Sequence, residues 1–222
     1  MAIINTKTTT TARLTRRLLL LATILITAGT GITTARGEEP AMTVAADDVL
    51  HFWFVELQPK DWWKSDQALD AVITGRFGKT LELAAHGELA GWRQSAGGRL
   101  AEVIVLDQFS RNILRGTAGA FANDALALSL AQDAVAAGID RELPVEQRRF
   151  LYMPYMHSET ASVHEQAMRL FATPGLEQSL AFERRHKAVI DRFGRYPHRN
   201  AVLGRESTLA EIEFMKQPGS SF

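Results

Sequence analysis

The chain contains no cysteine, which excludes disulfide bonds, thiolate metal sites and a cysteine nucleophile. Any metal site would therefore need His and carboxylate ligands. Proline and glycine are also scarce, with 7 Pro and 16 Gly in 222 residues, which excludes a low-complexity chain. No repeat of about 20 to 50 residues is evident, so the sequence is not that of an obvious solenoid. With 46% hydrophobic and 23% charged residues, it is typical of one globular domain.

Net charge is absent as well, because 25 basic residues balance 25 acidic ones. The basic residues are nevertheless gathered near the C-terminus, where seven Lys or Arg between positions 184 and 205 accompany a single acid, Asp191. Such a concentration of positive charge favours an anionic ligand or partner. Nucleic acid is not expected as a partner, because the basic cluster is small and the whole chain is neutral.

The first 41 residues form a separate, signal-like extension. Three arginines precede an apolar run over 18–26, and small residues suited to a cleavage site follow. The run is shorter than the roughly 20 residues that span a bilayer, so it predicts an exported protein, periplasmic or secreted. The pair Arg16 and Arg17 resembles a twin-arginine signal. The alternatives are a cytoplasmic protein that starts at Met42, or an uncleaved segment that tethers the chain to a membrane.

From Asp47 onward, apolar residues recur at helical spacing, and no pair of alternating strands joined by a hairpin turn is evident. The sequence therefore predicts one all-α domain over residues 45–217, followed by a flexible tail at 218–222. About eight helices joined by short loops favour antiparallel helix pairs.

Several residues predict where these helices end. Gly138 is placed to end a helix over 118–137, and Gly194 to end a helix over 176–193. Thr208 fits a capping box at the start of the last helix.

Other residues predict breaks between helices. Pro154 is expected to end or kink its helix near Tyr152, and residues 110–116 are expected to form a turn. Ser158 is expected to cap the helix that follows, in preference to a role as nucleophile. The neighbouring Trp62 and Trp63 are interpreted as core or loop-anchor residues, although exposure would indicate an interface.

The first polar segment with possible chemistry follows an apolar helix face at 106–116. Asp107, Arg111 and Arg115 are spaced four apart, which places them on one face if the segment is helical. That face suits a bidentate contact with a carboxylate or phosphate, aided by Gln108 and Asn112. The alternative is an exposed salt bridge worth at most about 1 kcal/mol.

The second segment, 154–159, places three polar side chains after a proline. His157 is a candidate general base, and Glu159 is the candidate to orient it. Ser158 is a poor nucleophile candidate because adjacent residues rarely point at a common atom.

The third segment, 192–205, is rich in arginine. Its arginines are expected to bind an anion, although arginines also hydrogen-bond carbonyl groups at helix ends. His198 is a candidate acid or base. The candidate ligand-binding residues in and near this segment are His186, Arg192, Arg195, Arg199, Asn200 and Arg205.

A metal site would have to use His157, Glu159, His186 and His198. Glu183 and His186 are three apart, as in the Glu-x-x-His element of di-iron helical bundles, but the sequence has no second copy of that element. Neither a metal nor another cofactor is therefore expected.

Four ordered segments together resemble the bacterial family called domain of unknown function 924. They are residues 48–54 (DVLHFWF), 106–112 (LDQFSRN), 154–159 (PYMHSE) and 192–200 (RFGRYPHRN). The resemblance covers about residues 47 to 215. It implies an all-helical, tetratricopeptide-like fold and carries no established activity. Ser110 stands where proline is common in the family, Tyr196 replaces a phenylalanine, and family members typically begin near the position of Met42.

Two hypotheses about function follow. The first is a polar pocket that binds a small anionic ligand, with hydrolysis or another acid/base reaction as the class of chemistry. The alternative is a tetratricopeptide-like protein-interaction scaffold with a basic groove for an acidic peptide. The oligomeric state stays open.

Overall fold

The computed structural model describes residues 44–220, and over these residues every regular element is a helix. The predicted all-α class is confirmed, whereas the tetratricopeptide-like label is not. The signal-like extension, residues 1–41, lies outside the described residues. The α-helices are α1 (Ala46–His51), α2 (Gln67–Ala85), α3 (Ala96–Ile104), α4 (Ser110–Ile113), α5 (Asp124–Ala136), α6 (Val145–His157), α7 (Ala161–Phe171), α8 (Glu177–Phe193) and α9 (Leu209–Met215).

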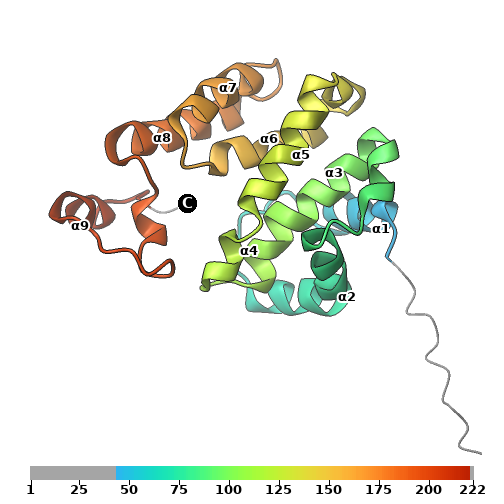
Figure 1. The fold of residues 1–222 in the computed structure, drawn as a ribbon, viewed down its shortest axis with the longest axis horizontal. Coiled ribbons are helices and arrows are strands. Elements are labelled where there is room, and N and C mark those ends of the chain that lie inside the picture. The colour runs from blue at the N-terminus through green and yellow to red at the C-terminus, as the bar shows by residue number, and fades with distance from the viewer. Residues whose placement is uncertain (1–43, 221–222) are drawn as a thin grey trace, which may run out of the picture. The chain divides into compact units, whose positions relative to one another are not determined.

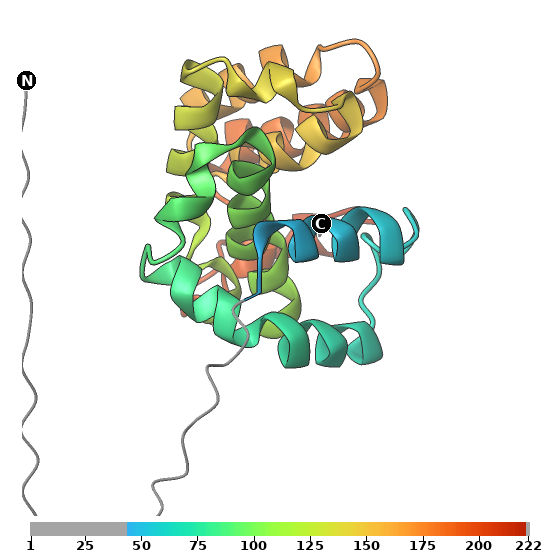
Figure 2. The same ribbon diagram turned by 90° about the vertical axis from the view of Figure 1, so that its right-hand side faces the viewer.

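Helices that follow one another in the chain pack together in the C-terminal half. α5 contacts α6, α6 contacts α7, and α7 contacts α8; the orange helices α7 and α8 lie side by side both in Figure 1 and in the turned view of Figure 2. α3 contacts α1, α5 and α6. Its residues Leu100, Val103 and Ile104 are completely buried, so α3 lies at the centre of the main core.

Aromatic side chains join the N-terminal helices to α6. Phe52 and Trp53 belong to a π-helical continuation of α1, Phe52–Glu56, and both are buried. The Phe109 ring lies 4.8 Å from that of Phe77 and 5.6 Å from that of Trp53, while Trp53 also meets Phe150 edge-on at 5.6 Å. The two edge-to-face contacts of Trp53, with Phe109 and Phe150, stabilise the core beyond the burial of apolar area alone.

α3 does not end at the polar segment but continues through it. A π-helix, Val105–Phe109, follows α3 and leads directly into α4, so the turn expected over 110–116 begins only after Ile113. The Ser110 hydroxyl donates a hydrogen bond of 2.7 Å to the Leu106 carbonyl, one turn earlier in this helical segment. The condition under which Asp107 and Arg111 share one helix face is therefore met.

The helix expected over 118–137 starts later, at Asp124, because a short 3₁₀ turn, Ala118–Phe121, precedes it. Its buried face consists of Ala127, Leu130, Ala131 and Ala134. The late start of α5 leaves Phe121 half-buried, outside the helix.

The helix does not end near Tyr152 as expected, because α6 runs through Pro154 to His157. Pro154 has no backbone N–H, so the last turn of α6 lacks one intrahelical hydrogen bond. Ser158 does not cap α7, whose N-cap residue is Thr160; its hydroxyl instead accepts the Thr160 N–H at 3.2 Å.

Other predicted ends are confirmed. Gly194 follows α8 with φ at 68°, in the left-handed region that glycine adopts without strain, and Gly138 follows α5 in the same conformation. Thr208 and Glu211 form the reciprocal hydrogen bonds of a capping box at α9. Over residues 44–220 we find no helix of the length and apolar character that a bilayer span requires.

Replacing Phe109 by alanine should destabilise the fold by about 3–5 kcal/mol, because a fully buried aromatic ring would leave a cavity. Urea denaturation followed by circular dichroism measures this loss. Phe182→Ala is the matched control, since Phe182 is 40% exposed and its loss should cost less than about 1 kcal/mol. Equal losses in the two variants would contradict the packing described here.

Candidate functional site

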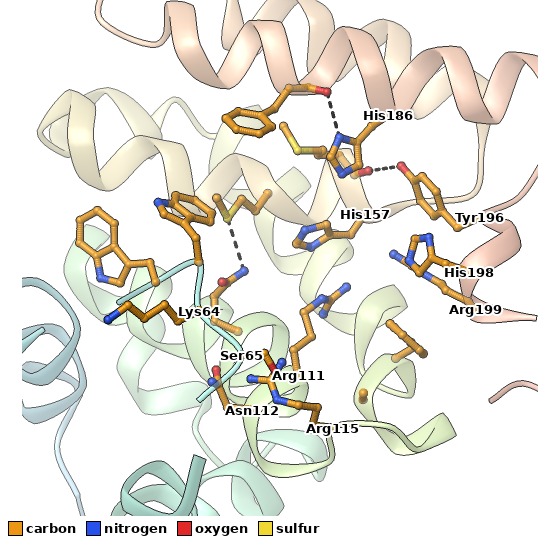
Figure 3. A pocket seen from close by; sticks show the side chains of 18 of the residues that line it. Lys64, Ser65, Arg111, Asn112, Arg115, His157, His186, Tyr196, His198 and Arg199 are labelled. Atoms are coloured by element: carbon orange, nitrogen blue, oxygen red, sulfur yellow. Dashed lines mark hydrogen bonds between the residues drawn. The ribbon is translucent and has the colours of Figure 1, made fainter. Parts of the chain in front are cut away.

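A cavity of about 600 Å³ lies between the N-terminal helices and the C-terminal segments. Its wall includes side chains from the segment 62–65, the π-helix and α4, α6, α8 and the loop after α8. In Figure 3 the side chains of Arg111, His157, His198 and Arg199 converge on its interior. The cationic side chains of the wall are Lys64, Arg111, Arg115, Arg149, Arg185 and Arg199.

Asp107 is the buried anion behind this cavity. The residue is completely buried within the π-helix. Its carboxylate accepts a hydrogen bond from Nδ1 of His157 at 2.7 Å and forms an ion pair with Nη1 of Arg111 at 2.9 Å. Nε2 of Gln108 also donates to Asp107. Burial alone would raise the pKa of Asp107, but the charges and hydrogen bonds of these neighbours hold that pKa well below its usual range. Asp107 is therefore a carboxylate at neutral pH.

The state of Asp107 fixes the state of His157. Because a carboxylate only accepts hydrogen bonds, Nδ1 of His157 carries the proton of this contact. Burial, followed by the charge of Arg111, lowers the pKa of His157 below its usual value. The imidazole is thus neutral at pH 7, and its Nε2 atom keeps the lone pair that a general base requires.

A second carboxylate, Asp124 at the start of α5, joins two arginines from distant segments. Nη2 of Arg111 donates to Asp124 at 3.0 Å, and Nη1 of Arg199 donates to the same oxygen at 3.2 Å. The Arg199 guanidinium also lies 4.6 Å from the ring centre of Phe121 and 4.5 Å from that of Tyr196. Burial, followed by the nearby Arg111 charge, lowers the pKa of Arg199.

The loop that carries Arg199 is held mainly by Glu159, Asn200 and Arg205, which do not line the cavity. Glu159 accepts two hydrogen bonds from Arg205, at 2.6 and 2.9 Å, and one from the Tyr196 backbone N–H at 2.7 Å. The Tyr196 hydroxyl donates to the Met156 carbonyl at 2.5 Å. Nε of Arg205 donates to Asn200. Glu159, Asn200 and Arg205 therefore position the loop.

The expectation that Glu159 orients His157 is wrong, because Asp107 makes that contact. Glu159 follows His157 by two residues, but its carboxylate turns to Arg205 instead. Among residues 44–220, no three His, Asp or Glu side chains come together as metal ligands would.

Two further predicted arginines lie elsewhere. Arg195 is paired with Glu211 at 2.7 and 2.8 Å, and Arg192 lies over the rings of Phe193 and Phe214. Neither arginine lines the large cavity. They hold α9 against the end of α8, so their predicted role in the same pocket is not supported by the geometry.

Asn112 and Arg115 do line the cavity, but both are turned to Asp70 of α2. Arg115 donates to this carboxylate at 2.6 and 2.8 Å, and Asn112 donates at 2.8 Å. The remaining predicted residues that line the cavity are Gln108, Arg111, His157, His186, His198 and Arg199.

The charged side chains of Lys, Arg, Asp and Glu that line the cavity are all positive. Six Lys or Arg line the cavity, and no Asp or Glu of the described chain lines it. The carboxylates that pair with the wall arginines, Asp70, Asp107 and Asp124 among them, lie behind the lining. Arg185, stacked on Phe182 at 4.4 Å, has no carboxylate partner within residues 44–220. The cavity thus presents donors and positive charge to whatever enters it.

Sequence reasoning missed several residues of this site. Asp124 and Phe121 carry no recognisable signal, since their arginine partners lie 10 to 78 residues away in the chain. Trp63 was interpreted as a core or anchor residue, yet it is 58% exposed and lines the cavity together with Trp62. The adjacent pair of tryptophans was the one signal that could have marked this wall.

The described residues form an all-helical domain, and histidines and arginines are among the residues that line its cavity. The chain belongs to the family described as bacterial protein of unknown function (DUF924), whose model matches residues 49–219. It is similar to a solved structure of a protein of unknown function from Agrobacterium tumefaciens, with 36% identity and a TM-score of 0.74. That match covers 77% of this chain and 96% of the other. No curated protein is significantly similar in sequence.

The buried histidines predict how stability depends on pH. Burial lowers the pKa of His186 to about 3, and burial with the Arg199 charge lowers that of His198 to about 4. In the unfolded chain both titrate near 6.5, so below that pH the unfolded state binds more protons. Stability should therefore fall as the pH drops from 7 to 5. Urea midpoints at the two values measure the fall.

The variant His186→Gln/His198→Gln should show a smaller loss of stability between pH 7 and pH 5. His86→Gln is the matched control, because it removes an exposed histidine outside the cavity. An undiminished loss in the double variant would contradict the burial-driven pKa values.

Proposed function

We propose that this cavity binds a small anionic ligand through Arg111 and Arg199. The observation that carries the proposal is the wall itself, which contains six cationic side chains and no carboxylate of the described chain. Arg199 contributes most to the argument. It is 6% exposed, shares its one carboxylate with Arg111, and its Nε atom is buried without a hydrogen bond within residues 44–220. A bound anion would compensate this guanidinium.

The size of the cavity favours a small molecule over an acidic peptide. Small-molecule sites enclose about 300–1,000 Å³, and the volume of about 600 Å³ found here lies within that range. A peptide would need a groove that extends along the surface. Binding of an acidic peptide in place of a small anion is the alternative that a binding experiment can reveal.

His157 gives the site a group for acid/base chemistry. Asp107 holds its Nδ1 proton and leaves Nε2 as a base, an arrangement like the His and Asp of hydrolases. Arg111 and Arg199 would stabilise negative charge that develops on a substrate nearby. We therefore propose hydrolysis, or proton abstraction next to an anionic group, as the class of reaction. Attack by water activated at Nε2 requires no side-chain nucleophile.

Replacing Arg199 by glutamine should weaken anion binding at least tenfold, because a charge-assisted contact is worth about 1.5–3 kcal/mol. A thermal-shift screen against phosphate, carboxylates and phosphate esters identifies a ligand, and calorimetry then gives its dissociation constant. Ligand at 100 times that constant should stabilise the native protein by about 2.7 kcal/mol.

Arg195→Gln is the matched control for this experiment, since Arg195 belongs to the same arginine-rich segment but lies outside the cavity. The affinity of Arg195→Gln for the identified ligand should equal that of the parent protein. Equal losses in the two variants would contradict the proposed site. Tight binding of an acidic peptide with no response to small anions would favour the scaffold function instead.

Replacing His157 by glutamine should lower turnover by about 10²–10⁴-fold, which is the usual contribution of a general base. The dissociation constant of the ligand should change by less than about threefold, because the arginines remain. Hydrolysis of ester and phosphoester analogues of the identified ligand measures the rate. Turnover that persists in His157→Gln would exclude this histidine as the base.

A further inference from the structure

One wall of the cavity is apolar, and anion binding alone assigns it no role. It consists of Trp62 and Trp63 from the loop before α2, Met153 and Met156 from α6, and Phe182 from α8. These side chains come from three separate parts of the chain. Their convergence on one cavity is therefore a property of the fold and not of a local sequence run.

Two of these aromatic side chains are exposed. Trp63 is 58% exposed and Phe182 is 40% exposed, yet each contributes to the cavity. Large apolar side chains left open to water around a concave site mark a surface that contacts an apolar ligand group. Trp63 lies on the loop before α2 and Phe182 lies on α8, so the two side chains line the cavity from different elements.

Trp62 and Trp63 of the apolar wall make several contacts within the protein. Nε1 of Trp62 donates a 2.8 Å hydrogen bond to the Trp53 carbonyl. The Trp63 ring lies nearly parallel to the Phe150 ring, with 12° between the ring planes and 6.3 Å between the ring centres. It meets the Trp62 ring edge-on. A ligand group that packs on this wall would pay little conformational entropy to order it.

Arg199 lies at the other side of the cavity, although two cations, Lys64 and Arg185, adjoin the apolar wall. In Figure 3, Lys64, which follows Trp63 directly, lies across the view from His198 and Arg199. An inorganic anion held by Arg199 would occupy only a small part of the 600 Å³, since one water occupies about 30 Å³. The apolar wall would then face water.

From this division we infer that the ligand is an amphiphilic organic anion, with a carboxylate or phosphate head and an unbranched aliphatic or aromatic body. The head binds Arg199 and Arg111, and the body lies against Trp63 and Phe182. The two methionines suit such a body, because their flexible thioether side chains adapt to different apolar shapes. This inference rests on the proposed anion site and adds the class of ligand.

A chain-length series tests the inference on the full-length protein. Dissociation constants are measured by calorimetry for acetate, butyrate, hexanoate and octanoate. Affinity should rise by up to about fourfold for each added methylene that is buried. Octanol, which has the same body without the charge, should bind at least tenfold more weakly than octanoate. Octyl phosphate in a parallel titration identifies which head is preferred.

Two variants separate the contribution of the ligand's charged head to binding from that of its apolar body. Arg199→Gln should weaken binding of every member of the series by the same factor. Trp63→Ala should weaken octanoate far more than acetate and reduce the gain per methylene. Val55→Ala, which removes an apolar side chain that is 62% exposed outside the cavity, is the matched control and should leave the series unchanged.

The outcomes distinguish this inference from the proposed function. If acetate and phosphate bind through Arg199 but affinity does not increase with chain length, the anion site stands and the amphiphilic ligand is wrong. If octanol binds as tightly as octanoate, the body alone is recognised, and both proposals fail. A chain-length gain that Trp63→Ala leaves intact would overturn the assignment of the apolar wall.

Discussion

The candidate site depends on one constraint, the complete burial of the Asp107 carboxylate. A buried charge is tolerated only where hydrogen bonds and opposite charge compensate it, and Arg111, His157 and Gln108 supply both. Asp107 and Arg111 come from the helical segment after α3, and His157 comes from the end of α6. The need to compensate Asp107 therefore draws these elements together and sets the tautomer of His157 before any ligand binds.

The same compensation extends outward through Asp124 to Arg199, so that carboxylates and guanidiniums alternate from the interior to the cavity. The carboxylates lie behind the lining, whereas the guanidiniums form part of it. Glu159 and Arg205 hold the loop that places Arg199 there. Six cationic side chains therefore line the cavity, although the chain as a whole carries no net charge.

The sequence predicts the local parts of this arrangement and misses most of the distant ones. Four-residue spacing was sufficient to place Asp107 and Arg111 on one helix face. Nothing in the sequence linked Asp107 to His157, which is 50 residues away, and proximity in sequence wrongly favoured Glu159 as its partner. Arg195 and Arg199 lie in one motif after Gly194, where no periodicity indicates direction. Only the packing of the loop sends Arg199 into the cavity and Arg195 towards Glu211.

The apolar wall and the charged groups reinforce one another. Burial lowers the pKa values of His157, His186 and His198, so the histidines stay neutral and do not compete for the negative charge that compensates the arginines. An apolar ligand body that displaced water from the apolar wall would lower the local dielectric constant further. Attraction between an anionic head and Arg199 would then strengthen, because Coulomb interactions increase as the dielectric constant falls. Recognition of head and body would thus be cooperative, and a ligand with both groups would bind more tightly than the separate contributions of each would give.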